Sequence, residues 1–520
     1  MDITQWTPVT GYARISEILR IRAEKKEDFK KIKPKTLEEL HTTNTKWLEL
    51  TPRDKEYIEV VYAVAADREI PGDPVWMYVI SPPGGMKTAI ARAIMKYDRI
   101  YTLDSLTTKT FISGLTEKTE DGEIVSVAGI LKHLDGKTLV IKDFTTILMK
   151  HNDIRNEIYG QLRAIYDGYF EAAYGTLPYP IRVRASLGLI LCVTPIIDKY
   201  IKAHTTLGER FLKIRQHPDS LKTTTRSLKN LGKETEMRLE LQIATKYYLS
   251  SLDFTKIPTI TDKQTQQLIT IAQFVAWGRS HVFCKYFKGQ IVSIEPIEVE
   301  VPTRVVKQLT KLALLLAVIR QHDLVELSDM KTIVRVALDT IIPKRWAIIQ
   351  AFMDKAVFET AGGISAHVGI HPQTVQNEVE IMMSLKMLVH GMVDGKTYFQ
   401  LSTKFNKFCE TISTIRLAEA DQHTVGKGVY GIREEKEVKK DTPLPPLLID
   451  QTDLLVFQLI VDYLYINGNK AKQMDIAAHT YDHGYDWATV KQVLKAHSTE
   501  ILKDGMVYTL VEGVKGGLHQ

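Results

Sequence analysis

Residues 75–88 read Val-Trp-Met-Tyr-Val-Ile-Ser-Pro-Pro-Gly-Gly-Met-Lys-Thr, and residues 89–97 continue with a helical pattern. The six apolar residues at the start predict a buried strand. A glycine-bearing loop between a strand and a Lys-Thr pair is the setting of a phosphate-binding loop, whose backbone N–H groups surround the phosphates. The stretch therefore predicts such a loop at the end of a strand.

The loop supplies both phosphate-binding and metal-binding groups. Lys87 would reach the outer phosphate oxygens, and the Thr88 hydroxyl would ligate Mg²⁺. The strict motif has glycine where this chain has Ser81 and Met86, so a chance Lys-Thr pair after two glycines is the alternative reading. The residues expected to hold the nucleotide phosphates here are Gly84, Gly85, Met86, Lys87 and Thr88.

Other apolar runs place the first strand in a sheet. They cover residues 99–103, 138–141 and 187–193, and they alternate with helical patterns up to about residue 215. Apolar strands separated by helices predict a parallel sheet that is covered on both faces. The fold class expected for this region is therefore α/β.

Polar residues follow two of these strands and one later loop. Asp143 follows the run 138–141 and could hold Mg²⁺, although Lys142 precedes it and no second acid stands beside it. Thr194 follows the run 187–193 and could orient an attacking water. Arg210 could reach a neighbouring subunit's phosphate as an arginine finger, or could form an ion pair with a nearby acid.

Composition places the chain among folded soluble proteins. Its 520 residues are 44% hydrophobic and 25% charged, with a net charge of +6 that permits a polyanionic partner without requiring one. Three distant cysteines cannot form a four-cysteine zinc site. We find no apolar stretch of bilayer length and no signal-peptide pattern at residues 1–6, and so expect a soluble, cytoplasmic protein without membrane contact.

The pattern along the chain predicts several folded parts. Residues 343–402 show three helical segments and a hairpin with an Asp394-Gly395 turn, the order of a winged helix, and residues 450–515 repeat it. The expected parts are a helical N-terminal region (1–72), an α/β nucleotide-binding core (73–218), a helical lid (219–342), a winged helix (343–417), a linker (418–449) and a second winged-helix-like domain (450–520).

The first winged helix has candidate DNA contacts. The second helix of its helix–turn–helix pair, residues 373–386, would present Gln373 and Gln376 to a major groove, with Lys396 on the wing. Because Glu378 and Glu380 follow directly, docking of a protein is the alternative.

Taken together, these segments resemble the AAA+ module of minichromosome-maintenance (MCM) helicases. That family's loop reads Gly-Asp-Pro-Gly-Thr-Ala-Lys-Ser, similar to residues 81–88 here, and its Ile-Asp-Glu-Phe is similar to residues 141–144. In that register Lys142 replaces the metal-coupled Asp and Asp143 the catalytic Glu. A shift by one residue instead keeps Asp143 as the metal carboxylate and puts Phe144 at the position of the catalytic acid. Residues 113–131 resemble the family's stretch with the helix-2 insert, and its N-terminal barrel and zinc finger have no counterpart.

The resemblance extends to the channel hairpin and the lid. Residues 161–186 are similar to the family's helix and pre-sensor-1 hairpin, which grips DNA in the ring channel. Thr194 occupies the sensor-1 position, Arg210-Phe211 is similar to the arginine-finger segment, and Arg304 falls at the sensor-2 position. Arg182 and Arg184 could instead pair with acids on the sheet face. The hairpin's candidate DNA contacts are Tyr174, Tyr179, Arg182 and Arg184.

The resemblance implies an ATP- and Mg²⁺-dependent motor that acts on DNA as a homo-oligomeric ring, with a hexamer as the family's form. Lys87, Thr88 and Asp143 would act within one subunit, and Arg210 and Arg304 across the interface. The contrasting hypothesis is an ATP-binding switch, scaffold or helicase loader that hydrolyses ATP weakly. The order of the segments favours the motor, whereas Lys142 and Met86 favour the switch.

Overall fold

The structure is a computed structural model that describes most of the chain between residues 32 and 418 and a few short segments beyond. The described ranges are 32–111, 116–118, 124–126, 129–173, 180–200, 209–295, 299–358, 360–393, 396–418, 460, 470–472, 476, 490, 494, 501–504 and 507–510. The chain forms two compact units: residues 1–281, 298–346 and 410–429 make the first, and residues 282–297, 347–409 and 430–520 the second.

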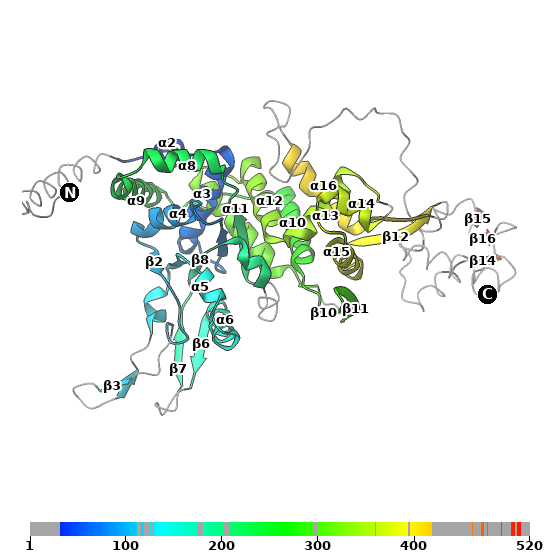
Figure 1. Ribbon diagram of the computed structural model, residues 1–520, viewed down its shortest axis with the longest axis horizontal. Coiled ribbons are helices and arrows are strands. Elements are labelled where there is room, and N and C mark those ends of the chain that lie inside the picture. The colour runs from blue at the N-terminus through cyan, green and yellow to red at the C-terminus, as the bar shows by residue number, and fades with distance from the viewer. Residues whose placement is uncertain are drawn as a thin grey trace, which may run out of the picture. The chain divides into compact units, whose positions relative to one another are not determined.

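The first unit is an α/β fold built on a five-stranded parallel sheet (Figure 1). Its strand order is β2-β5-β8-β1-β9. The strands are β1 (Trp76–Ile80), β2 (Ile100–Leu103), β5 (Thr138–Ile141), β8 (Gly188–Val193) and β9 (Phe211–Arg215). The four apolar runs in the sequence are confirmed as strands, whereas β9 was not predicted from the sequence.

Both faces of this sheet are buried, as the apolar runs predict. On one face, alternate residues such as Trp76, Tyr78 and Leu191 pack in a core with helix α6 (Asn152–Tyr166). The fully buried Trp76 indole N–H donates to the carbonyl of Leu187 at 2.8 Å, which satisfies its one polar atom. Helices α3 and α4 contact the sheet as well, so helices and strands form one core.

Helix α3 (Pro52–Ala65) belongs to this core. A capping box between Thr51 and Asp54 begins the helix, and the segment from Tyr57 to Ala65 is almost entirely buried against β1, β8, β9 and a later helix, α11. The sequence predicted a separate helical region up to residue 72. The structure instead makes α3 a layer of the α/β core, because its charged residues find buried partners. Residues 1–31 lie outside the described part.

Several further helices and two hairpins complete the first unit. They are α2 (Leu37–Trp47), α4 (Lys87–Ala93), α5 (Thr145–Leu148), α8 (Ser220–Lys229), α9 (Glu234–Ser251), α10 (Asp262–Arg279), α11 (Thr303–Ile319) and α12 (Leu327–Thr340), with the antiparallel hairpins β3 (Thr116–Lys118) with β4 (Ile124–Ser126) and β6 (Tyr169–Ala172) with β7 (Ile181–Arg184). Figure 1 shows β6 and β7 extending away from the central sheet.

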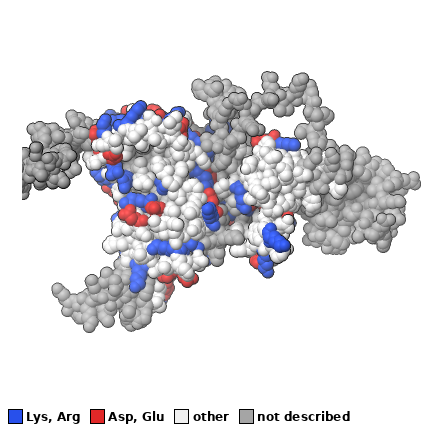
Figure 2. All heavy atoms as spheres, viewed as in Figure 1, with Lys and Arg blue, Asp and Glu red and all other residues white. Residues whose placement is uncertain are grey.

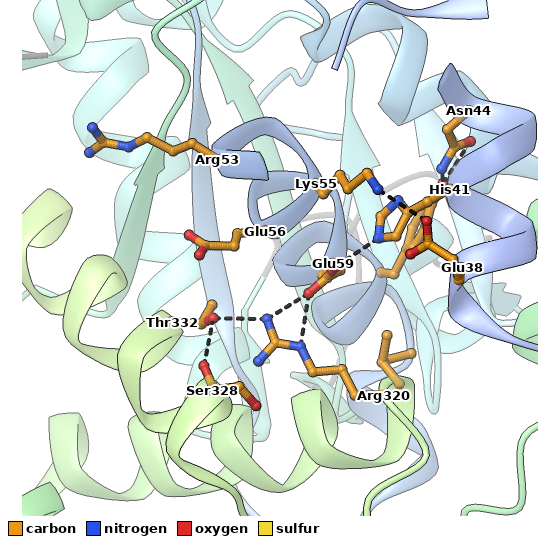
Figure 3. Close-up of polar contacts among 12 residues, drawn as sticks. Glu38, His41, Asn44, Arg53, Lys55, Glu56, Glu59, Arg320, Ser328 and Thr332 are labelled. Atoms are coloured by element: carbon orange, nitrogen blue, oxygen red, sulfur yellow. Dashed lines mark hydrogen bonds and ion pairs between the residues drawn. The ribbon is translucent and has the colours of Figure 1, made fainter. Parts of the chain in front are cut away.

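A buried network of charges joins α3 to α11 and α12 (Figure 3). The Arg320 guanidinium, just after α11, donates to the Glu59 carboxylate at 2.6 and 2.8 Å and to Asp329 at 2.8 Å. His41, from α2, contacts the other Glu59 oxygen at 2.7 Å. Burial acts to raise the pKa of Glu59, but His41 and Arg320 outweigh it and hold that pKa below its ordinary value. The network therefore holds α2 and α3 against α11 and α12 through paired charges.

The described part of the second unit contains helices, a hairpin and a second hairpin inserted from earlier in the chain. Helix α13 (Pro343–Asp354) continues into it from the first unit, followed by α14 (Ala361–Val368), α15 (Pro372–Ser384), the hairpin β12 (Leu388–Val393) with β13 (Lys396–Leu401), and the start of α16 (Thr403–Leu417). The elements from α13 to β13 lie where the sequence predicts them, whereas α16 was not predicted. Residues 419–459 are outside the described part, and of the C-terminal region the structure describes the antiparallel strands β14 (Lys470–Lys472), β15 (Ile501–Asp504) and β16 (Val507–Leu510) with four single residues.

The inserted hairpin corrects the expectation that residues 219–342 are helical throughout. Strands β10 (Cys284–Phe287) and β11 (Gln290–Ile294) pair antiparallel between α10 and α11 and belong to the second unit. Lys288 and Gly289 connect them with φ values of 48° and 82°. Two successive positive φ angles are typical of the tight turn that suits the twist of a hairpin.

Candidate nucleotide-binding site

The glycine-bearing loop leaves the carboxyl end of β1 and needs both of its glycines. Gly84 has a φ of +77°, which favours a residue without a Cβ atom. A Cβ atom on Gly85 would lie 2.0 Å from Ser81 Oγ, so no larger side chain fits without movement. The loop is held to the sheet by the Ser81 N–H, which donates to the Val193 carbonyl at 3.1 Å. The Ser81 hydroxyl therefore fills space that the strict glycine motif leaves open.

Gln216, which was not predicted from the sequence, holds the glycine-bearing loop in place through hydrogen bonds. Its Oε1 accepts the Ser81 hydroxyl at 2.7 Å and the Met86 N–H at 3.0 Å, and its Nε2 donates to Asp54 at 3.3 Å. Gln216 follows β9 directly and is buried. The Met86 N–H, which we expected to face a phosphate, is thus occupied by a side chain of the same subunit. A polar residue after a parallel strand is the one signal that could have identified it.

Lys87 and Thr88 begin α4 beside this loop. The Lys87 side chain is largely buried, and it has no hydrogen bond or ion pair with another described residue. An ammonium group without a protein carboxylate partner, next to a glycine loop, suits an anionic ligand. Thr88 is exposed at the same edge. The residues present therefore fit a phosphate group.

Asp143 and Thr194 lie at the same edge of the sheet, because they follow the parallel strands β5 and β8. The Asp143 carboxylate accepts the Thr145 N–H at 3.1 Å, and the Thr194 N–H donates to Thr145 Oγ1 at 3.3 Å. Burial raises the pKa of the Cys192 thiol to about 12, with Lys87 acting to lower that pKa and Asp143 to raise it. Cys192 is therefore an inert core residue whose position reports that both charges are near.

The residues on either side of Asp143 take different roles. The Lys142 ammonium forms a 2.7 Å ion pair with Asp104, which follows β2. Phe144 is fully buried and packs near Tyr78. Asp104 was missed in the sequence, although an acid directly after a parallel strand is a usable signal. It lies three strands from β1, roughly 14 Å at about 4.8 Å per strand, and so is too far to contact a phosphate at Lys87.

A pocket of about 210 Å³ adjoins the glycine loop. Its walls come from the loop, from the segment after α2 and from helices α8 and α9. The Arg226–Glu49 ion pair at 2.9 Å and the bond from Asn230 to the Trp47 carbonyl at 2.7 Å join these walls. The volume is below the roughly 300–1,000 Å³ of pockets that enclose a whole drug-sized ligand, so it suits one flat ring system. Residues lining it include Trp47, Leu48, Gly84, Gly85, Met86 and Met237.

Arg210 and Arg304 lie together, but near the amino ends of the parallel strands, whereas the glycine loop leaves their carboxyl ends. Their guanidinium groups lie 5.4 and 5.7 Å from the centre of the Tyr166 ring. Arg210 also pairs with Asp167 at 3.1 Å, the alternative that the sequence left open. Arg210 precedes β9, whose first residue pairs with Trp76, the first residue of β1. The glycine loop follows the last residue of β1, so about five residues of strand, roughly 16 Å, separate Arg210 from the loop of its own subunit.

The β6–β7 hairpin carries two of the predicted DNA contacts. Arg182 pairs with Glu171 across the hairpin at 2.9 Å, the alternative that the sequence left open, and Arg184 is exposed opposite Tyr169. Tyr174 and Tyr179 lie outside the described residues.

The amides predicted to read a DNA groove are bonded within their own helix. Gln373 Nε2 donates to Asn377 at 3.0 Å, and Gln376 Nε2 donates to Glu380 at 2.8 Å. Asn377 in turn donates to the Gly289 carbonyl of the inserted hairpin at 2.8 Å. Lys396 begins β13, and its side chain lies outside the described part. The structure thus brings α15 against β11, an arrangement the sequence did not predict.

No protein-family model matches the chain, and no curated protein matches it. Among the described residues, no cluster of three or more His, Cys, Asp or Glu side chains is placed to hold a metal ion. Nor does any helix within the described ranges combine the length and apolar character needed to cross a bilayer.

Proposed function

We propose that the chain is an ATP-dependent AAA+ motor that acts on DNA, similar to the MCM helicases, with helicase or translocase activity in DNA replication. The observation that carries the proposal is the base-sized pocket beside a two-glycine loop and an unpaired lysine. A flat base in the pocket and phosphates at the loop are the two parts of a nucleotide. The strand order, with β8 between β1 and β5, supports it because Thr194 then lies between the loop and Asp143.

In this proposal, the residues at the carboxyl ends of the strands share the work. Gly84 and Gly85 allow the backbone to approach the phosphates, and Lys87 neutralises the outer phosphate oxygens. Thr88 would hold Mg²⁺, which neutralises phosphate charge when bound, and Asp143 would either hold it as well or act as the catalytic acid. Thr194 orients the attacking water by hydrogen bonding.

The distance of Arg210 from its own loop supports action between subunits. Since roughly 16 Å of strand separates them, Arg210 and Arg304 can contact a nucleotide only in a neighbouring copy. We therefore propose a homo-oligomeric ring, with a hexamer as the form the resemblance implies, and ATP at each interface. Single-stranded DNA in the channel would meet the β6–β7 hairpin, and duplex DNA would meet winged helices in the second unit.

One observation favours a second candidate, an ATP-binding switch or helicase loader that turns over slowly. The only carboxylate that follows β5 is Asp143, and the neighbouring Lys142 is already paired with Asp104. The Met86 N–H is occupied by Gln216. Both features weaken charge stabilisation during hydrolysis without preventing nucleotide binding.

ATPase rates with and without single-stranded DNA separate the two candidates. For the motor, DNA raises the rate, and both Lys87→Ala and Arg210→Ala abolish it. Lys96→Ala, an exposed lysine of the same segment, is the matched control and keeps the wild-type rate. If sites lie between subunits, mixing the two inactive variants restores part of the activity, because some interfaces then contain both Lys87 and Arg210. A rate insensitive to DNA and to Lys87→Ala would refute the motor.

A further inference from the structure

The inserted hairpin β10–β11 is anchored rather than loosely attached. Its turn carbonyl at Gly289 accepts the Asn377 amide of α15 at 2.8 Å, and β11 packs on that helix. The Glu295 N–H donates to the Phe283 carbonyl at 3.0 Å and closes the open end of the hairpin. All of these residues belong to the second unit. The hairpin therefore presents its side chains from a fixed base.

The surface of this hairpin combines aromatic rings with positive charge. Phe283, Tyr286 and Phe287 are 50%, 47% and 64% exposed. Lys285 and Lys288 are exposed among them, and the Lys288 ammonium lies 5.5 Å from the centre of the Phe287 ring. Residues 282–294 contain no Asp or Glu. Figure 2 shows Lys and Arg atoms gathered where Figure 1 places β10 and β11.

Three exposed aromatic residues within five positions are unusual on a surface that serves solvent contact alone. A ligand for this surface must offer flat apolar faces and negative charge at close spacing. Unpaired nucleotides meet both conditions, since each base has a face that stacks on an aromatic ring and each phosphate attracts a lysine. An acidic protein segment supplies the charge but not the repeated flat faces.

We propose that the β10–β11 hairpin is a binding site for single-stranded nucleic acid, with Phe287 as a base-stacking platform and Lys285 and Lys288 as phosphate contacts. The biological meaning of this site rests on the proposed DNA-directed function. Its chemistry does not require ATP, because every residue involved lies in the unit that does not contain the glycine loop. It also gives a DNA contact to a part of the chain where the sequence predicted only helix.

Binding of a fluorescein-labelled oligo(dT) of 20 nucleotides to the full chain, followed by anisotropy without nucleotide, tests the site. Loss of one stacking ring in Phe287→Ala should weaken binding roughly 5- to 100-fold. Phe287→Tyr keeps a ring and should stay within about 3-fold of wild type. The double variant Lys285→Gln with Lys288→Gln should reduce the slope of log affinity against log salt by about 1.4, at about 0.7 for each phosphate contact.

The matched control is Leu221→Ala, an exposed apolar residue of α8 in the first unit, which should leave affinity unchanged. Equal affinities for wild type and Phe287→Ala overturn the proposal. So does a change of molar mass by light scattering in Phe287→Ala without a change in DNA affinity, since the hairpin would then serve a second copy of the chain. The wild-type ATPase rate, measured alongside, separates this site from the motor. Phe287-dependent DNA binding by a wild-type chain that shows no DNA-stimulated ATPase activity sustains the site and refutes the motor, and the reverse result does the opposite.

Discussion

Removing the Arg320 guanidinium should destabilise the first unit far more than removing the ammonium group of the half-buried Lys55 on the same face of α3. Arg320 bonds two buried carboxylates, Glu59 and Asp329, whose side chains are 9% and 0% exposed. In Arg320→Met, both acids remain buried without their cation. Breaking a buried pair in this way costs about 3–5 kcal/mol.

In Arg320→Met, Glu59 and Asp329 keep other partners, so the expected loss of stability lies near the lower limit of this range. Glu59 keeps His41 at 2.7 Å, and Asp329 keeps His322 at 3.0 Å and the Glu326 N–H at 2.8 Å. We therefore expect a loss of about 3 kcal/mol. At roughly 2 °C for each kcal/mol in a unit of this size, the midpoint of thermal unfolding should fall by roughly 6 °C.

The assay is thermal unfolding followed by tryptophan emission, at one scan rate for all variants. The matched control is Lys55→Met on α3, because Lys55 forms a 3.3 Å pair with the exposed Glu38 (Figure 3). A surface pair of this kind contributes about 0–1 kcal/mol. Because the folded-state pKa of Glu59 is lowered, its contribution is present above the ordinary carboxyl pKa and is lost as pH falls through the folded value. Equal midpoints for Arg320→Met and Lys55→Met at pH 7 would refute the assignment of this network as a main support.

Three further predictions concern the loop and its surroundings. Burial, and after it the charge of Arg53, lowers the pKa of His217 to about 4. On acidification the unfolded chain therefore takes up this proton before the folded chain does, and the stability should fall as the pH drops from about 6.5 towards 4. His217→Gln should flatten the pH dependence of the unfolding midpoint over that window. Gly85→Ala should weaken binding of a fluorescent ATP analogue at least about tenfold. Adding Ser81→Gly to that variant should restore part of the affinity, because it removes the 2.0 Å contact with Ser81 Oγ. An affinity that Ser81→Gly does not raise would show that this contact is not the reason for the loss. Asp143→Asn should lower the ATPase rate while the affinity for that analogue stays within a few-fold, and an unchanged rate would exclude Asp143 from hydrolysis.

The sheet could be predicted from the sequence to the extent that its strands are apolar. The run 138–141 is entirely buried and was recognised, whereas β9 alternates apolar residues with Lys213 and Arg215 and was not. Residues outside the strand hold it in place: the buried Arg215 guanidinium pairs with Asp198 at 2.7 Å, and the backbone N–H of Lys213 donates to Thr340 Oγ1 at 2.9 Å. A single sequence does not show such partners. It therefore treats buried charges as exposed ones.

The candidate site, like the sheet, has one part that could be predicted from the sequence and another that depends on residues distant in the chain. Residues contiguous with the glycine loop could be identified, because a loop motif is local in the chain. Gln216 lies 135 positions after Ser81, which it contacts, and the Glu49–Arg226 pair beside the pocket spans 177 positions. The inserted hairpin is different, since its Lys288-Gly289 turn between alternating strands is a local signal that could have been recognised.

The burial of Phe144 bears on the position of Asp143, which the sequence left open between two registers. If Phe144 stood at the catalytic acid position, its side chain would have to face the phosphates. It is instead fully buried, with its ring centre 5.9 Å from that of Tyr78. Under the proposed function, burial of an aromatic residue there favours the register that aligns Phe144 with the Phe of the MCM Ile-Asp-Glu-Phe. In that register Asp143 would take the catalytic position, and Lys142, paired with Asp104, would take the metal-coupled one. The metal would therefore depend on Thr88 and the nucleotide itself, so Lys142→Asp should raise the Mg²⁺-dependent ATPase rate, and a rate unchanged or lowered by that substitution would favour the other register.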